Sequence, residues 1–143
     1  MLGRLGELLT FGFVPMLFCM IALPVLVTAG DEAGLFGTEW VATRIKGVAA
    51  PEKGAPTLRI DAEGRVSGFA GCNRFSGTAR INGTAIAVGK LATTRMACAG
   101  PSMASEVDYL RALVKVTKFD LSNAGLVLSD ADGKPLLMFA RIT

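Results

Sequence analysis

Histidine is absent from the 143-residue chain, which excludes a histidine-based catalytic triad and any histidine-ligated metal site. Charged residues are scarce at 19%, whereas 51% of the residues are hydrophobic. This balance excludes a disordered polar chain. The chain also lacks the Gly-rich pattern, ending in Lys and Ser or Thr, that cradles phosphates. We therefore predict no cofactor, no metal, no catalytic residue and no enzymatic activity.

Charge is missing altogether between Glu7 and Asp31. The apolar run at 8–27 would extend about 30 Å as a helix, which is the thickness of a bilayer core. Val27 and Ala29 supply the small residues of a signal-peptidase site. Two interpretations of residues 1–30 stay open, a cleaved signal peptide or an uncleaved membrane anchor in the form of a hydrophobic helix. Both predict that the rest of the chain is exported to the periplasm, either free or anchored to the cytoplasmic membrane.

The remainder predicts a linker at 31–37 and one domain at 38–143. Short runs of alternating polarity, separated by Gly, Asn and Pro, are typical of β-strands. Asn82-Gly83 is the strongest hairpin signal. Charges of both signs follow Asp31, which favours a mixed solvated surface over nucleic-acid binding. Strands are expected at 40–45, 57–60, 65–69, 75–81, 84–88, 91–96, 119–121, 126–128 and 136–142.

One segment has a helical period. Met103, Val107, Leu110 and Val114 are spaced by four, three and four residues, so they would line one face of a helix at about 102–116. Ser102 suits the N-cap, and Glu106 favours the first turn. The expected fold is mainly β with this one helix, in which a bent antiparallel sheet forms a partly open barrel and the helix covers it.

Two cysteines, Cys72 and Cys98, belong to the part expected to be exported. An even pair in an oxidising compartment predicts a disulfide, and two free buried thiols are the alternative. A catalytic thiol would need an activating base, which the absence of histidine removes. Two cysteines are also too few for a zinc site.

Two blocks of sequence carry a family resemblance. The first is Gly-Cys-Asn-Arg-Phe-Ser-Gly at 71–77, and the second is Thr-Arg-Met-Ala-Cys at 94–98. In this order and spacing they resemble the META domain family, over about 100 residues from Trp40 onward. The resemblance implies a small antiparallel barrel with one helix, found in bacterial envelope proteins linked to stress tolerance and without an established enzymatic activity. It also places the family's paired cysteines on Cys72 and Cys98.

The function predicted from the sequence is a non-enzymatic periplasmic domain that interacts with an unknown envelope protein. The candidate interaction residues are Asn73, Arg74 and Arg95, within the two blocks. Asn73 is also expected to bond backbone in a turn after Cys72. The alternative is a carrier of a lipid or another hydrophobic ligand in a barrel pocket. Such a pocket would be lined by Phe69, Phe75, Leu91 and Phe139.

Overall fold

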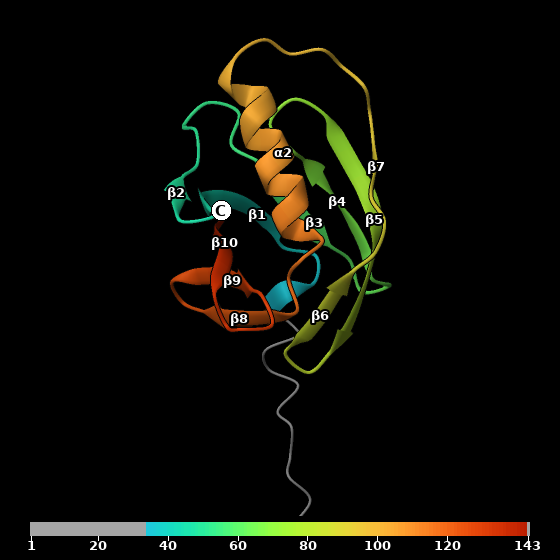
Figure 1. Ribbon diagram of the computed structural model, residues 1–143. Helices are drawn as coiled ribbons and strands as arrows, with labels where there is room; N and C mark the ends of the chain where they lie inside the picture. The colour runs from blue at the N-terminus through green and yellow to red at the C-terminus, as the bar shows by residue number, and fades with distance from the viewer. Residues whose placement is uncertain (1–33, 143) are drawn as a thin grey trace, which may run out of the picture.

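The computed structural model describes residues 34–142 (Figure 1). The predicted signal peptide or anchor at 1–30 lies outside the described residues. Between residues 34 and 142, no helix is both long and apolar enough to cross a membrane. The described residues form the predicted mainly β fold with one complete helix, α2 (Pro101–Leu113).

The sheet is antiparallel and closes on itself, because the last strand pairs with the first. Of its ten strands, all but two form a closed barrel. In order around the barrel these are β1 (Glu39–Ile45), β3 (Thr57–Ile60), β4 (Arg65–Phe69), β5 (Arg74–Asn82), β6 (Ala85–Val88), β8 (Lys118–Ser122), β9 (Gly125–Ser129) and β10 (Pro135–Arg141). The short strands β2 (Val48–Ala49) and β7 (Ala92–Thr93) pair only with β1 and β5.

The barrel has one narrow joint, between β6 and β8. Their register consists of one pair, Ala85 with Lys118. Two flanking backbone bonds support it, from Ile86 N–H to the Thr117 carbonyl (3.0 Å) and from Phe119 N–H to the Thr84 carbonyl (2.9 Å). Helix α2 lies across the barrel and packs against β1 and β10 (Figure 1). The predicted sheet with one covering helix is thus confirmed, and its barrel is closed.

Tyr109 anchors the helix in the barrel interior. Its fully buried ring packs edge-on against Phe75 (5.8 Å between ring centroids) and Phe139 (6.2 Å). Its hydroxyl donates a hydrogen bond to the carbonyl of Thr57 (3.0 Å). Burial away from water raises the pKa of this phenol, so the hydroxyl remains a donor.

Replacing Tyr109 with phenylalanine should destabilise the fold by about 1–2 kcal/mol, because the Thr57 carbonyl loses its buried donor while the ring packing is retained. Urea unfolding monitored by circular dichroism would measure the difference. A change below about 0.5 kcal/mol would show that this hydrogen bond does not help to hold the helix in place.

The first residue of the helix and its buried face both differ from the prediction. Its N-cap is Gly100 rather than Ser102, and Pro101 occupies the first turn. The predicted apolar stripe is largely exposed, with Met103 at 36%, Val107 at 41% and Val114 at 47%. The buried residues of the helix are Glu106, Tyr109, Ala112 and Leu113. The buried face was predicted wrongly because the periodicity was counted from apolar residues. Such a count assigns the charged Glu106 to solvent, whereas Glu106 belongs to the buried face.

The end of the predicted linker is part of the fold. Leu35 is fully buried, Phe36 forms a parallel bridge with Ile60, and Gly37 N–H donates to the Ile60 carbonyl (2.8 Å). The linker prediction therefore needs correction from residue 34 onward, because these residues pack against the barrel.

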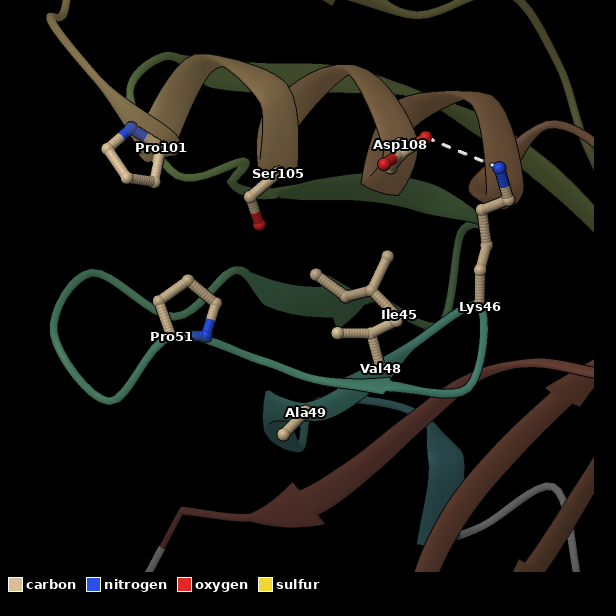
Figure 2. A pocket seen from close by; sticks show the side chains of 8 residues that line it. All are labelled: Ile45, Lys46, Val48, Ala49, Pro51, Pro101, Ser105 and Asp108. Atoms are coloured by element: carbon tan, nitrogen blue, oxygen red, sulfur yellow. Dashed lines mark hydrogen bonds and ion pairs between the residues drawn. The ribbon is translucent and has the colours of Figure 1, made fainter.

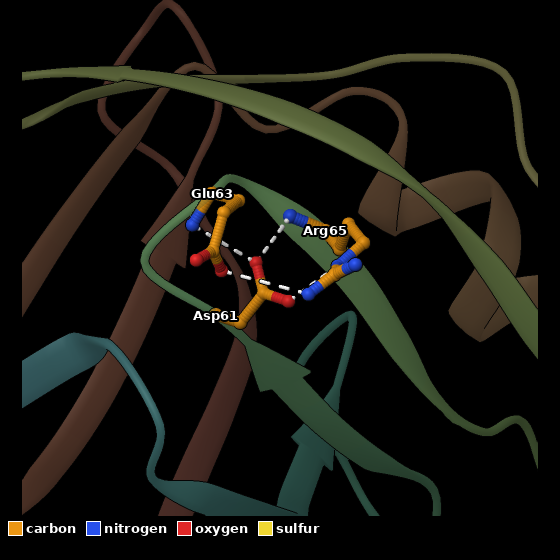
Figure 3. A network of polar contacts seen from close by, with 3 residues as sticks. All are labelled: Asp61, Glu63 and Arg65. Carbon is orange, nitrogen blue, oxygen red and sulfur yellow. Dashed lines mark hydrogen bonds and ion pairs between the residues drawn. The ribbon is translucent and has the colours of Figure 1, made fainter.

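The turn between β3 and β4 is held by Asp61 (Figure 3). Its carboxylate accepts the N–H groups of Glu63 (3.1 Å) and Arg65 (2.9 Å) and pairs with the Arg65 guanidinium (2.6 Å). The hydrogen bond from the Arg65 side chain holds the pKa of Asp61 below its ordinary value. Asp130 accepts the N–H groups of Asp132 and Lys134 in the same way, in the turn that connects the antiparallel strands β9 and β10.

Candidate functional site

The two motif cysteines form a disulfide, as predicted, with their Cα atoms 5.9 Å apart. Cys72 lies between β4 and β5 and is 2% exposed, whereas Cys98 lies in the segment leading to α2. The bond therefore ties the extended segment at 92–98 to the start of β5. The alternative of two free thiols does not hold in this structure.

A buried carboxylate on α2 also holds the backbone at the start of β5. Glu106 is 6% exposed, and one of its oxygens accepts the backbone N–H groups of Cys72 (2.9 Å) and Asn73 (2.7 Å). The other oxygen accepts the Nδ2 group of Asn73 (2.8 Å). Glu106 thus holds the backbone beside the disulfide, a role that its position after Pro101 in the sequence did not reveal.

Asn73 links this cluster to the neighbouring segment. Its Oδ1 accepts the Met96 N–H (2.6 Å) and the Thr94 hydroxyl (3.0 Å), while its Nδ2 also donates to the Met96 carbonyl (3.3 Å). The side-chain amide therefore pairs with Met96 as a backbone peptide group of a neighbouring strand would. At 4% exposure, Asn73 cannot present a surface to a partner, so its proposed interaction role is corrected to a structural one.

The hydrogen bonds determine the charge of Glu106. Burial raises the pKa of its carboxyl, but the hydrogen bonds from the Asn73 side chain and from the backbone of Asn73 and Cys72 favour the ionised form. These hydrogen bonds together hold the pKa below its ordinary value of 4.5. The carboxylate is therefore ionised at neutral pH.

We expect the stability of the fold to decline as the pH falls below about 4.5. The folded-state pKa of Glu106 is lowered, so the unfolded chain takes up this proton first. Its contribution is complete above the unfolded-state pKa and is lost as the pH falls through the folded-state value. Urea midpoints measured from neutral pH to about pH 3 should fall less steeply in Glu106→Gln than in the wild type. Equal slopes would contradict the assignment.

Arg74 and Arg95, the other candidate interaction residues, are both exposed. They belong to a charge pattern that the sequence analysis missed. No Asp or Glu occurs between Glu63 and Glu106, whereas this stretch contains several cations. Four of them are exposed on or beside β5 and β7 and form no ion pair within residues 34–142. We call these four the basic face: Arg74, Arg80, Lys90 and Arg95.

The described residues do not bring together the four side chains that would line the pocket of the alternative, ligand-carrier function. Phe75 and Phe139 are buried against Tyr109. Phe69 and Phe75 both border a hollow that Glu39, Arg59 and Arg74 also line, whereas Leu91, which is half-buried, and Phe139 do not line it. The four side chains therefore do not border a common cavity. Packed side chains fill the barrel, among them Trp40, Phe119, Leu126 and Leu137.

A groove of about 470 Å³ lies between α2 and the β1–β2 hairpin (Figure 2). Its two charged groups pair with each other, Lys46 Nζ with Asp108 Oδ1 (3.3 Å). The Ser105 hydroxyl points toward the hairpin and has no hydrogen-bond partner within the described part of the chain. The rest of the lining is apolar, from Ile45, Val48, Ala49, Pro51 and Pro101.

A family model matches nearly all of the described residues. The model of the META domain matches residues 33–142. A search of curated proteins gives no match to the chain.

Solved structures share the fold. A protein from Burkholderia xenovorans, determined by NMR, is 27% identical, with a TM-score of 0.66 over 80% of this chain and 88% of that one. A second NMR structure is 26% identical, with a TM-score of 0.59 over 75% and 91% of the two chains. A DUF4847 family protein from Bacteroides vulgatus, 15% identical with a TM-score of 0.58 over 76% and 95%, shares the fold alone. Neither the family model nor these structures indicate a catalytic activity.

Proposed function

The chain belongs to the META domain family, and we propose that it acts as a non-enzymatic domain of the cell envelope that binds another protein. The N-terminal segment exports the domain to the periplasm, free or anchored to the cytoplasmic membrane. The role in envelope stress tolerance that the family resemblance implies is part of this proposal.

Export is supported by two features. The charge-free run between Glu7 and Asp31 has the length and flanks of a signal peptide or an anchor. The Cys72–Cys98 disulfide is a bond that persists in oxidising compartments and is rare in the cytosol. A cytosolic location would leave this bond exposed to reduction.

The observation that carries the binding role is the basic face. Its four cations are exposed and have no carboxylate partner within residues 34–142. A face of one sign attracts a partner of opposite charge and increases the rate of association. Glu106, the buried acid of the described residues, is fully engaged by Asn73 and Cys72. This supports a structural role for Glu106.

Export is tested by fractionating cells that express the full chain and alkylating thiols without a reductant. We expect the domain in the periplasmic or membrane fraction, with Cys72 and Cys98 unmodified until reductant is added. Recovery from the cytosol with both thiols freely alkylated would overturn the export part of the proposal.

Binding is tested in the native host by photo-crosslinking. A photoreactive residue replaces Ser76, which is exposed on β5 between Arg74 and Arg80. The matched control replaces Asn123, which is exposed in the β8–β9 turn. We expect a discrete protein adduct from position 76 and none from position 123. Equal labelling at both positions, or no adduct at position 76, would contradict a protein-binding role for the basic face.

A further inference from the structure

We propose that the partner docks as an extended acidic segment that adds a strand to the free edge of β7. We define the β7 edge as residues 92–96, comprising β7 and its continuation to Met96. The inference rests on the proposed function and specifies the kind of partner that the basic face would bind.

The β7 edge is hydrogen-bonded on one side only. Phe75 pairs with Thr93 and Ser76 with Ala92, and Thr94 N–H donates to the Arg74 carbonyl (3.0 Å). β7 has no other strand partner among residues 34–142, and it lies at the margin of the sheet in Figure 1. Residues 92–96 are all exposed, so the other side of the edge is accessible to a new strand.

The backbone groups on the open side are those of alternate residues. Residues 94 and 96 direct their N–H groups toward Arg74 and Asn73, and successive residues of a strand face opposite edges. Thr93 and Arg95 therefore direct their N–H and carbonyl groups outward. Unpaired edge groups of this kind form a template for strand addition.

The edge is already held in the extended form that a partner needs. Asn73 clamps Met96 through both of its amide atoms, and the disulfide fixes Cys98 two residues later. A pre-ordered edge lowers the entropy that binding must overcome, because less backbone has to be immobilised when the complex forms. The structural cluster around Glu106 thereby supports a binding surface.

Charge selects the chemistry of the partner. Arg74, Lys90 and Arg95 are exposed beside the edge, and no acidic residue occurs anywhere in 64–105. Acidic side chains on an added strand would meet these cations, whereas a second copy of the same edge would bring like charges together. The outward N–H and carbonyl groups favour a peptide over an anionic membrane, which offers no strand to pair with them. An acidic extended segment is thus the occupant that satisfies both the charge and the backbone.

The test uses the full chain in a mild non-ionic detergent, with a fluorescein-labelled peptide of alternating Glu and Thr as the probe. Fluorescence anisotropy measures the dissociation constant. Thr93→Pro removes one outward N–H and keeps every inward bond, because proline is tolerated on an edge strand where its nitrogen faces solvent. Thr93→Val is the matched control that keeps the N–H.

We expect Thr93→Pro to weaken binding at least about tenfold, equivalent to about 1.4 kcal/mol, and Thr93→Val to change it less than about twofold. Arg95→Gln should weaken binding and reduce its salt dependence. Equal binding by the proline and valine variants, or no binding of the peptide, would overturn strand addition. Competition by mixed micelles of phosphatidylglycerol and the same detergent, together with no effect of Thr93→Pro, would mean that the basic face binds an anionic membrane and not a peptide. Dimerisation of the chain that Thr93→Pro abolishes would mean that the β7 edge binds a second copy of the chain and not a peptide.

Hydrogen exchange in the unmodified chain provides a measurement that does not depend on the folding of a variant. The Thr93 and Arg95 amides should exchange quickly alone and slowly with saturating peptide. Unchanged exchange of both amides would overturn the inference.

The proposed function and the strand addition can fail separately. An adduct at position 76 with equal peptide binding by the proline and valine variants would retain the binding role and reject strand addition, whereas no adduct would reject the role itself.

Discussion

Replacing Glu106 with alanine is expected to destabilise the fold by about 3–6 kcal/mol, the range for a buried charged acceptor that leaves several donors unpaired. Its two oxygens accept the N–H groups of Cys72 and Asn73 and the Nδ2 group of Asn73. Alanine would leave all three donors without an acceptor, at a buried position where Glu106 itself is 6% exposed. The free energy of unfolding from urea titration measures the loss.

Two variants make this prediction specific. Glu106→Gln keeps one oxygen for the two backbone donors, but its amide nitrogen would face the Asn73 Nδ2 group, another donor. We therefore expect a smaller cost of about 1–3 kcal/mol. Val107→Ala changes the next, exposed residue of the helix and should stay within about 0.5 kcal/mol. Equal costs for alanine at positions 106 and 107 would show that the buried carboxylate does not anchor this region.

Removal of the disulfide is the second large effect. Replacing Cys72 and Cys98 together with serine should cost about 3.5 kcal/mol in the chain-entropy model, because their sequence separation is 26 residues. Urea unfolding of the oxidised wild type, the reduced wild type and the double variant gives the comparison. The reduced protein and the double variant should agree. Unchanged stability would mean that Asn73 and Glu106 alone hold residues 94–98.

The strands were predictable because their signals are local. The predicted strands at 57–60 and 65–69 coincide with β3 and β4. Asn82-Gly83 connects β5 to β6 as a hairpin, with Asn82 opposite Ala85. Turn residues and alternating polarity depend on neighbours in sequence, so the sequence alone was sufficient. The even number of cysteines after Asp31 likewise predicted the Cys72–Cys98 bond.

The buried polar cluster was not predictable in the same way. Glu106 and Asn73 are far apart in sequence, and each would ordinarily be assigned to the surface. Only the tertiary fold brings the carboxylate to the backbone of Cys72, where hydrogen bonds compensate for its burial. The same misassignment placed the apolar face of α2 on Met103 and Val107, which are exposed.

The basic face could have been found from the sequence. The stretch between Glu63 and Glu106 holds Arg74, Arg80, Lys90 and Arg95 without an acid, and charge counted by segment rather than over the whole chain reveals the asymmetry. The free edge of β7 could not have been found from the sequence. Whether one side of a strand is unpaired depends on how all the other strands pair.

The pairing of β1 with β10 sets the order of events during biogenesis. Trp40 lies opposite Arg141, and Val41 opposite Ala140, so the barrel cannot close until nearly the whole polypeptide is available to fold. Closure that depends on such remote contacts is slow. A chain threaded N-terminus first through a translocation channel would stay unfolded while in transit and lock only on arrival, which is the state that such a channel requires.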